Sequence, residues 1–250
     1  MQFTKRPGGF AITSDISVKC NSALLKIQEK DLTDFFHDYF SVEIKHAKSI
    51  GEANIKIYID KHQNLGEEGY SLTIGKEEVV VKANTKVGIF YAMQTIKQMV
   101  EKENDGTFYL PCVDIVDSPA YKHRILRLDV SGKFMPVDEV KTIINHMAFV
   151  KMNRLILVVA SDEHFRIAIP EYPLLNKDAD KIYTRNDIVN IIHYAKRHNV
   201  MVVPEVNLFD RNCAISNNYR SLCDASSLDP EIEKTNFSDQ CYLNVFDPKV

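Results

Sequence analysis

The stretch "ILRLDVSGKFMPVDEVKTIINHMAFVKMNRLILVVA", residues 125–160, decides the fold of the C-terminal half of this chain. Apolar segments lie at both ends, and between them Val140, Ile144 and Met147 recur at helical spacing. Pro136 lies where the first helical turn tolerates proline. The pattern predicts strand, helix, strand. Near-continuous apolar strands joined by helices are typical of a parallel sheet covered on both faces, as in barrels and doubly wound folds.

The same rhythm continues toward the C-terminus. Thr184, with Asp187 three residues later, predicts the start of another helix, and "VMVVPEV", residues 200–206, predicts a third strand. We therefore expect about three βα units of an incomplete (β/α)8 barrel of the TIM type over residues 119–250. In such folds the chemistry lies just past the carboxyl ends of the strands.

The first 118 residues have a different pattern. Extended segments and a hairpin alternate with two apolar-striped helices, the second of which Asn84 or Thr85 can cap. The expected elements are an extended start over 10–20, a helix over 22–40, a strand over 55–60, a hairpin over 70–83 and a helix up to about residue 102. Residues 1–118 thus predict an α+β domain with a largely antiparallel sheet and two helices.

Composition excludes several classes of partner. The net charge is -3, with acidic and basic residues interspersed, so no basic footprint for nucleic acid or for a membrane surface is indicated. The longest apolar run near the middle, residues 155–160, is far shorter than the roughly 20 residues of a membrane-spanning helix. The N-terminus lacks an apolar signal region, which leaves the compartment undecided between the cytosol and removal of a targeting segment.

Five cysteines are scattered without C-x-x-C spacing, which argues against zinc and against a thioredoxin-like motif. Cys213, Cys223 and Cys241 could hold one disulfide if the protein is secreted, and Asn236 would then begin a glycosylation sequon.

The remaining motifs do not indicate a cofactor. His193 and His198 are five residues apart, about 140° around a helix, so they cannot hold one metal ion together. The sequence contains no phosphate-binding glycine motif and no nucleophile elbow. We expect neither a metal nor an organic cofactor.

Four long segments resemble the family 20 glycoside hydrolases, the β-N-acetylhexosaminidases. "EEGYSLTIGKEEVVVKANTKVGIFYAMQTIKQMV", residues 67–100, is similar to the α+β domain that precedes the barrel in that family. Residues 110–157 resemble its linker, first strand, first helix and second strand, and residues 165–175 and 183–206 continue the match in order.

This resemblance implies hydrolysis of terminal β-linked N-acetylglucosamine or N-acetylgalactosamine. The family retains the anomeric configuration and uses the substrate's own acetamido oxygen as nucleophile. An Asp orients that group and the adjacent Glu serves as general acid and base. The family's Asp-Glu pair follows the fourth barrel strand, so we expect residues 1–250 to lack it and to be inactive alone. A glycan with a terminal N-acetylhexosamine is the expected ligand, if there is one.

Several family site positions carry unsuitable residues here. The substrate-gripping Arg falls on Gly132, and the Asp that steadies the catalytic His falls on Ser161. That His falls on Arg211, and the Asp of the third-strand motif falls on Asn207. Because the apolar scaffold survives while these polar positions do not, the pattern indicates a degenerate active site.

Aromatic and histidine side chains that the family uses in its site are also replaced in this sequence. Two histidines usual on the family's second strand are replaced by Ile156 and Val158. The chain has no tryptophan, the residue on which the family stacks its sugar, and Phe165 is expected to be a weaker platform.

Carboxylates elsewhere do not replace the missing pair. Asp138 and Glu139 are expected in the first turn of a helix, where acidic residues complement the helix dipole. Asp162-Glu163 follows the second strand but aligns with a different family motif. The retained family-like residues, expected to be structural, are Arg124, Asp129, Asp162 and Glu205.

An incomplete barrel also poses a physical problem. A closed eight-stranded barrel usually needs about 250 residues, and three strands leave an apolar edge and an unfilled inner face. Three hypotheses follow: the N-terminal half of a longer hexosaminidase-like protein, a complete non-catalytic relative that binds glycans or another protein, or a degenerate product. In the first two, a missing C-terminal segment or a partner chain covers the open sheet.

Overall fold

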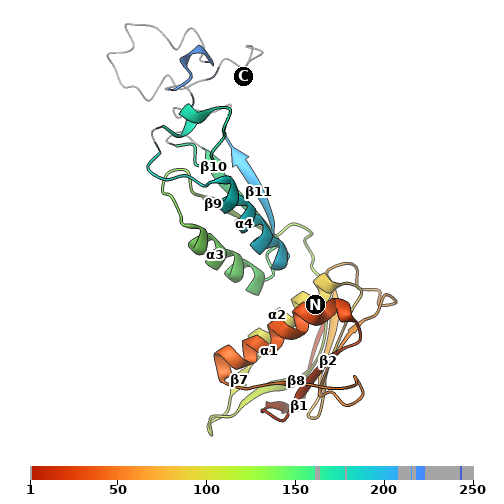
Figure 1. Cartoon of the computed structure of the whole chain (residues 1–250). Coiled ribbons are helices and arrows are strands. Elements are labelled where there is room, and N and C mark those ends of the chain that lie inside the picture. The colour runs from red at the N-terminus through yellow and green to blue at the C-terminus, as the bar shows by residue number, and fades with distance from the viewer. Residues whose placement is uncertain are drawn as a thin grey trace. The chain divides into compact units, whose positions relative to one another are not determined.

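The computed structural model describes residues 2–160, 164–177, 179–207, 215, 218–222 and 243. The chain forms two compact units, Met1–Lys122 and His123–Val250, each with its own secondary structure (Figure 1). They are described separately below.

The N-terminal unit is a sheet covered by two helices. Its strands are β1 (Gln2–Ile12), β2 (Ser17–Cys20), β3 (Lys45–His46), β4 (Ile55–Ile59), β5 (Tyr70–Ile74), β6 (Val79–Ala83), β7 (Glu101–Lys102) and β8 (Phe108–Asp117). Its helices are a short 3-10 turn (Ala23–Leu25), α1 (Lys26–Phe40) and α2 (Lys86–Gln98). The strand order is β1-β8-β5-β6-β4-β2-β3, with β7 on β8.

The sheet is mixed, so the predicted largely antiparallel sheet is wrong for one half of it. Strands β1, β8, β5 and β6 pair antiparallel, whereas β6, β4, β2 and β3 pair parallel. The physical reason lies in the connections. Helix α1 connects β2 to its parallel neighbour β3 as a crossover, and a crossover returns the chain in the same direction. Alternation of apolar residues identifies a strand but does not encode its direction.

Both helices lie on one face of this sheet (Figure 1). Ile55, Ile57 and Val81 are fully buried, while their sequence neighbours face the other side. Helix α2 packs on β4, β5 and β6, and Thr85 is its N-cap: its Oγ accepts hydrogen bonds from the backbone N–H groups of Val87 and Gly88, both at 3.1 Å. Of the two predicted caps, the structure has Thr85.

The start of α2 approaches Gly69, just before β5, so closely that only glycine fits at position 88. A Cβ at Gly88 would lie 2.4 Å from the carbonyl oxygen of Gly69 and 2.8 Å from Cβ of Ala83. Since both neighbours are backbone or a short side chain, neither can move aside easily. The contact fixes α2 against the sheet.

The C-terminal unit contains a parallel sheet of three described strands. Its elements are β9 (Ile125–Asp129), α3 (Val137–Phe149), β10 (Arg154–Ala160), a 3-10 turn (Pro173–Asn176), α4 (Arg185–Arg197), β11 (Met201–Val206) and a second 3-10 turn (Arg220–Leu222). The order β11-β10-β9 and the parallel pairing confirm the predicted succession of strands and helices. An N-terminal α+β domain followed by part of a barrel describes this fold.

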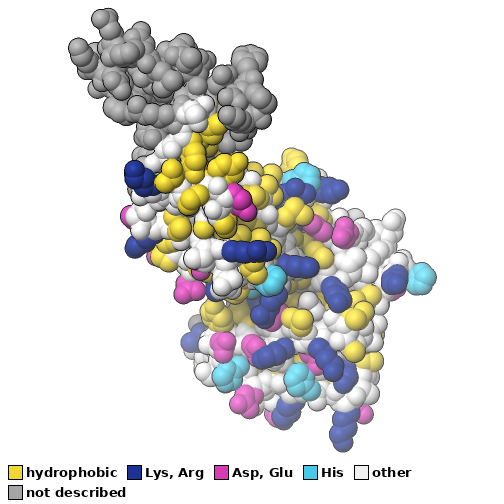
Figure 2. Space-filling model, turned by 45° about the horizontal axis from the view of Figure 1, so that its top comes forward, with side chains coloured by type: hydrophobic (Ala, Val, Ile, Leu, Met, Phe, Trp, Pro, Cys, Tyr) yellow, Lys and Arg dark blue, Asp and Glu magenta, His cyan; other side chains and the backbone are white. Residues whose placement is uncertain are grey.

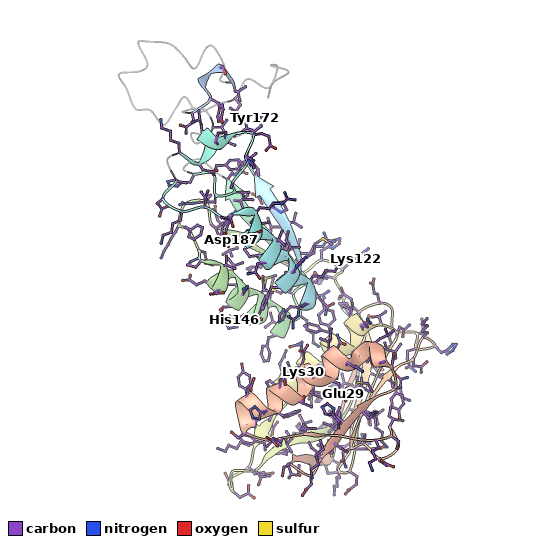
Figure 3. The ribbon with its side chains drawn as sticks, in the orientation of Figure 1. Glu29, Lys30, Lys122, His146, Tyr172 and Asp187 are labelled. Atoms are coloured by element: carbon purple, nitrogen blue, oxygen red, sulfur yellow. The ribbon has the colours of Figure 1, made fainter. Side chains whose placement is uncertain are left out.

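One face of the three strands is buried under α3 and α4. The core combines Leu155, Leu157 and Val159 of β10 with apolar residues of both helices, among them Ile144 and Ile191. Helix α4 begins with the predicted capping box: Thr184 Oγ accepts from the backbone N–H of Asp187 at 3.2 Å, and the Asp187 carboxylate accepts from the backbone N–H of Thr184 at 2.9 Å. Figure 3 shows Asp187 at the first turn of α4.

The surface carries both signs of charge. Basic and acidic side chains are interspersed over the face of the molecule that Figure 2 presents. In the part of the chain that the structure describes, no helix has the length and apolar content needed to span a membrane.

We expect Gly88→Ala to destabilise the N-terminal unit by about 1–3 kcal/mol, because the added methyl group overpacks the contact with Gly69. Hydrogen exchange of β5 and β6 peptides would measure the change. Gly51→Ala is the control: nothing lies within 4 Å of its Cβ position, so its effect should stay within about 0.5 kcal/mol. Equal protection in the two variants would contradict the steric explanation.

Candidate functional site

The carboxyl ends of β9, β10 and β11 lie at one edge of the C-terminal sheet. In the register, Asp129 of β9 is opposite Val158 of β10, which is opposite Glu205 of β11. The segments that follow these strands therefore start beside one another. This edge is where the sequence predicts a site.

Asp129 is engaged by the segment that follows its own strand. Its Oδ1 accepts hydrogen bonds from the backbone N–H of Ser131 at 2.9 Å and from the Ser131 hydroxyl at 2.5 Å. Ser131 is 1% exposed. The carboxylate thus orders the turn after β9.

Arg166 joins the strand-end segments, a role that was not predicted from the sequence. It is 1% exposed, although it carries a full charge. Its Nε donates to the carbonyl of Ser131 at 2.8 Å, and Nη2 donates to the carbonyl of Gly132 at 2.8 Å and to Nδ1 of His164 at 3.4 Å. The guanidinium therefore holds the backbone after β9 next to the segment that begins at His164.

The other guanidinium nitrogen ties in a third segment. Nη1 of Arg166 donates to Asp180 at 2.5 Å and to the carbonyl of Lys181 at 2.9 Å. All five N–H groups of the side chain thus have partners, which is what a buried arginine requires. The hydrogen bond from Arg166 holds the pKa of Asp180 below its ordinary value. A lone arginine in an apolar segment gives no sequence signal for this role.

Tyr183 contacts the end of the same segment, at Phe134 and Met135. It is fully buried, its hydroxyl donates to the carbonyl of Met135, and its ring lies 4.8 Å from that of Phe134. Burial raises the pKa of Tyr183 to about 12. Together Arg166 and Tyr183 fix the segment from Ser131 to Met135.

Glu205 pairs with a basic residue two strands away. Arg127 of β9 reaches across β10, with its Nη2 2.6 Å and its Nε 3.1–3.2 Å from the Glu205 carboxylate oxygens. The hydrogen bonds from Arg127 lower the pKa of Glu205. Both residues lie on the sheet face turned away from α3 and α4, and Ile125 and Met201 on that face are 46% and 56% exposed.

The structure brings some of the predicted site residues together and not others. Gly132 and Asn207 follow β9 and β11 at the strand-end edge, where the backbone N–H of Asn207 donates to the carbonyl of Ala160 at 3.3 Å. Arg124 lies at the opposite end of β9, and its Nε donates to the carbonyl of Lys151 at 2.6 Å. The predictions that fall outside the described residues are those for Ser161, Asp162, Glu163, Arg211, the cysteines Cys213, Cys223 and Cys241, and the sequon at Asn236.

Phe165 is not a sugar platform. It is 5% exposed and packs with Ala160, Leu175, Ile215 and Leu243, so its ring faces are covered by protein. The prediction was wrong because a phenylalanine after a strand has the same sequence signal whether its ring points into the core or into a cleft.

The described residues give little support for metal or acid/base chemistry. Among them, no cluster of three or more His, Cys, Asp or Glu side chains could hold a metal ion. Asp138 and Glu139 lie in the first turn of α3, as expected. Two described carboxylates at the strand-end edge, Asp129 and Glu205, already accept hydrogen bonds from Ser131 and Arg127. At this edge the hydrogen bonds of Asp129 and Glu205 therefore serve the local structure.

Comparisons with known proteins give a consistent match. The sequence model described as "Glycosyl hydrolase family 20, catalytic domain" matches residues 121–250, and "Glycosyl hydrolase family 20, domain 2" matches residues 1–118. The chain is 28% identical over 227 residues to a beta-hexosaminidase of Porphyromonas gingivalis, covering 83% of this chain and 29% of that protein. It is 30% identical over 202 residues to beta-hexosaminidase subunit A2 of Dictyostelium discoideum, covering 77% and 37%.

Solved structures agree. The N-acetyl-beta-hexosaminidase of Streptomyces plicatus in complex with Thio-NAglucal superposes with a TM-score of 0.81 at 26% identity, over 90% of this chain and 48% of that one. The Flavobacterium johnsoniae chitobiase shares the fold, with a TM-score of 0.79 at 24% identity, over 89% and 36%. The chain spans about a third of the length of the curated relatives that it matches.

We expect Arg166→Leu to destabilise the C-terminal unit by about 2–3 kcal/mol, since it leaves backbone carbonyls of the strand-end segments unpaired. Arg166→Lys should recover little, because an ammonium group cannot reproduce the five-donor fork. Hydrogen exchange of β9 and β10 peptides would measure both. Arg127→Gln is the matched control: it breaks a half-exposed ion pair, so its loss of protection should be much smaller than that of Arg166→Leu. Equal losses at the two arginines would refute the special role of Arg166.

Acidification should weaken the C-terminal unit through Asp180. Its pKa is lowered in the folded state, so its contribution is present above the unfolded pKa, near 3.8, and is lost as pH falls through the folded value. Urea unfolding of the chain between pH 6 and pH 2.5 should show this loss, and Asp180→Asn should reduce the slope in that acidic range. An unchanged slope in the variant would show that other carboxylates account for it.

Proposed function

The chain belongs to glycosyl hydrolase family 20, and on that basis we propose that it supplies domain 2 and the first part of the catalytic domain of a β-N-acetylhexosaminidase-like protein. The division lies after residue 118, with residues 119–250 contributing three βα units of the barrel. Relatives named beta-hexosaminidase and the matched S. plicatus structure support this assignment. The ligand class is a glycan that ends in β-linked N-acetylglucosamine or N-acetylgalactosamine.

Residues 1–250 alone do not hydrolyse this substrate. The observation that carries this proposal is the commitment of Asp129 and Glu205 to Ser131 and Arg127, which leaves no free carboxyl pair among the described strand-end residues. The family's substrate-assisted mechanism uses an Asp that orients the acetamido group and an adjacent Glu as general acid and base, and this pair is expected after a fourth strand.

Replacement of polar site positions supports the same conclusion. The resemblance assigns a substrate-binding Arg to Gly132, a relay Asp and His to Ser161 and Arg211, and a further Asp to Asn207. A glycine offers no charge to a sugar hydroxyl, and an arginine cannot serve as a general base at neutral pH.

The open sheet face requires a cover. Ile125 and Met201 are about half exposed beside the Arg127–Glu205 pair. Additional barrel strands or a partner chain bury this face in the functional protein, because an exposed apolar sheet face invites association.

A second candidate is a non-catalytic relative that binds a glycan or another protein. The observation that favours it is Arg166, which fixes the turn at Gly132 although the family's sugar-binding side chain is absent there. A turn that keeps its structure but carries no catalytic group is better suited to binding a ligand than to hydrolysing it.

We predict that purified residues 1–250 release no 4-nitrophenol from 4-nitrophenyl N-acetyl-β-D-glucosaminide above a mock preparation, because the acid/base pair is absent. An active family 20 enzyme assayed in parallel provides the positive control.

Turnover that is lost in Asp129→Asn or Glu205→Gln would overturn the proposal and assign activity to this chain. N-acetylglucosamine binding without turnover, measured by calorimetry, would favour the binding relative.

A further inference from the structure

A hollow of about 750 Å³ lies on the N-terminal unit, and its lining includes no residue of the strand-end edge described above. Its floor consists of Lys56 and Tyr58 of β4 with Val80 and Lys82 of β6. These residues alternate with buried ones that pack toward α2, so the hollow opens on the sheet face opposite the helices. In the parallel register Tyr58 lies beside Lys82 and Lys56 beside Val80, which makes the floor one continuous surface.

The wall of the hollow is ordered. It consists of the segment from Ile59 to His62 and of Asn21. The Asn21 side chain donates to the carbonyl of Ile59 at 3.1 Å and accepts from its backbone N–H at 2.9 Å. These two hydrogen bonds hold Asn21 against the end of β4.

Both acidic groups of the hollow are already satisfied. Glu78 accepts a hydrogen bond from Lys56 Nζ at 2.6 Å, and the Lys56 side chain is only 19% exposed. Asp60 accepts from the backbone N–H of His62 at 3.0 Å and from Gln63 Nε2 at 2.6 Å. Neither carboxylate needs a ligand.

The basic side chains of the hollow have fewer hydrogen-bond partners than the acidic ones. All three of Lys61, His62 and Lys82 line the hollow, and in the described part of the chain their side chains form no hydrogen bond or ion pair. Asp60 lies near enough that the charges of His62 and Lys82 add to the hydrogen bond from Gln63 in lowering the pKa of Asp60. Lys19 of β2 lies beside Lys56 in the register and adds positive charge at the edge. The ammonium groups of Lys61 and Lys82 therefore line the hollow together with the ring of Tyr58.

We infer that this hollow binds a small acidic sugar, one carrying a sulfate or carboxylate group. Lys61 and Lys82 suit the oxyanion as point charges, and the Tyr58 ring suits the apolar face of a sugar. The volume falls in the range of about 300–1,000 Å³ that is usual for small-molecule sites. The site is independent of the proposed hydrolase assignment, and its test does not involve hydrolysis.

An NMR titration of the full chain tests this inference with four probes: N-acetylglucosamine 6-sulfate, glucuronic acid, N-acetylglucosamine and sodium sulfate. An acidic sugar should shift amide signals of β4 and β6 and bind more tightly than either the neutral sugar or inorganic sulfate. The tighter of the two acidic sugars identifies the preferred oxyanion.

Lys82→Gln should weaken that binding by about tenfold, since it removes one charge-assisted contact. Lys48→Gln, an exposed lysine outside the hollow, should leave it within about twofold. Lys82 is exposed, so the variant should fold normally.

Four results would overturn the inference. They are the absence of shifts with every probe, equal binding of neutral and acidic sugars, equal binding of inorganic sulfate and the sulfated sugar, and equal losses in Lys82→Gln and Lys48→Gln. Equal binding of inorganic sulfate would mean that the hollow is a simple anion site. Equal losses in the two variants would mean that diffuse surface charge attracts the sugar.

Discussion

Parallel pairing is the constraint on which most of this structure depends. Two neighbouring parallel strands cannot be joined by a tight turn, so a crossover must cover one sheet face. In the C-terminal unit, α3 and α4 provide that cover and bury one face of β9, β10 and β11. The same requirement aligns the carboxyl ends of the three strands, which is why the candidate site lies there. It also explains why the second face, with Ile125 and Met201, stays open.

The sequence predicts these local elements well because their signals are local. Thr184 and Asp187 form a capping box within one helical turn, and Pro136 directly precedes the first residue of α3. Strand direction in the N-terminal sheet was predicted wrongly because it depends on pairing between distant segments. Phe165 and Arg166 show the same limit for the candidate site. They are neighbours in sequence and both buried, yet one packs in a core and the other bonds five partners, and no periodicity distinguishes these roles.

The strand-end edge separates two properties that are often treated as one: the support of an active site and its reacting groups. The support is retained: Asp129, Arg166 and Tyr183 each form a hydrogen bond with the segment that follows β9. The reacting and binding groups are not retained in the same way, because Gly132 has no side chain with which to bind a substrate. A protein can retain the first property without the second, because buried hydrogen bonds are needed for folding whether or not catalysis follows.

The saturated guanidinium of Arg166 affects how mutational screens of related proteins should be read. In an active relative with an arginine in the same bonding pattern, substitutions would lower activity by destabilising the turn that supports the site, and a screen scored by activity alone could not distinguish this loss from the loss of a reacting group. Its five donors are all used within the protein, so it has none left for a sugar. Sensitivity to substitution at such a position reports architecture rather than chemistry.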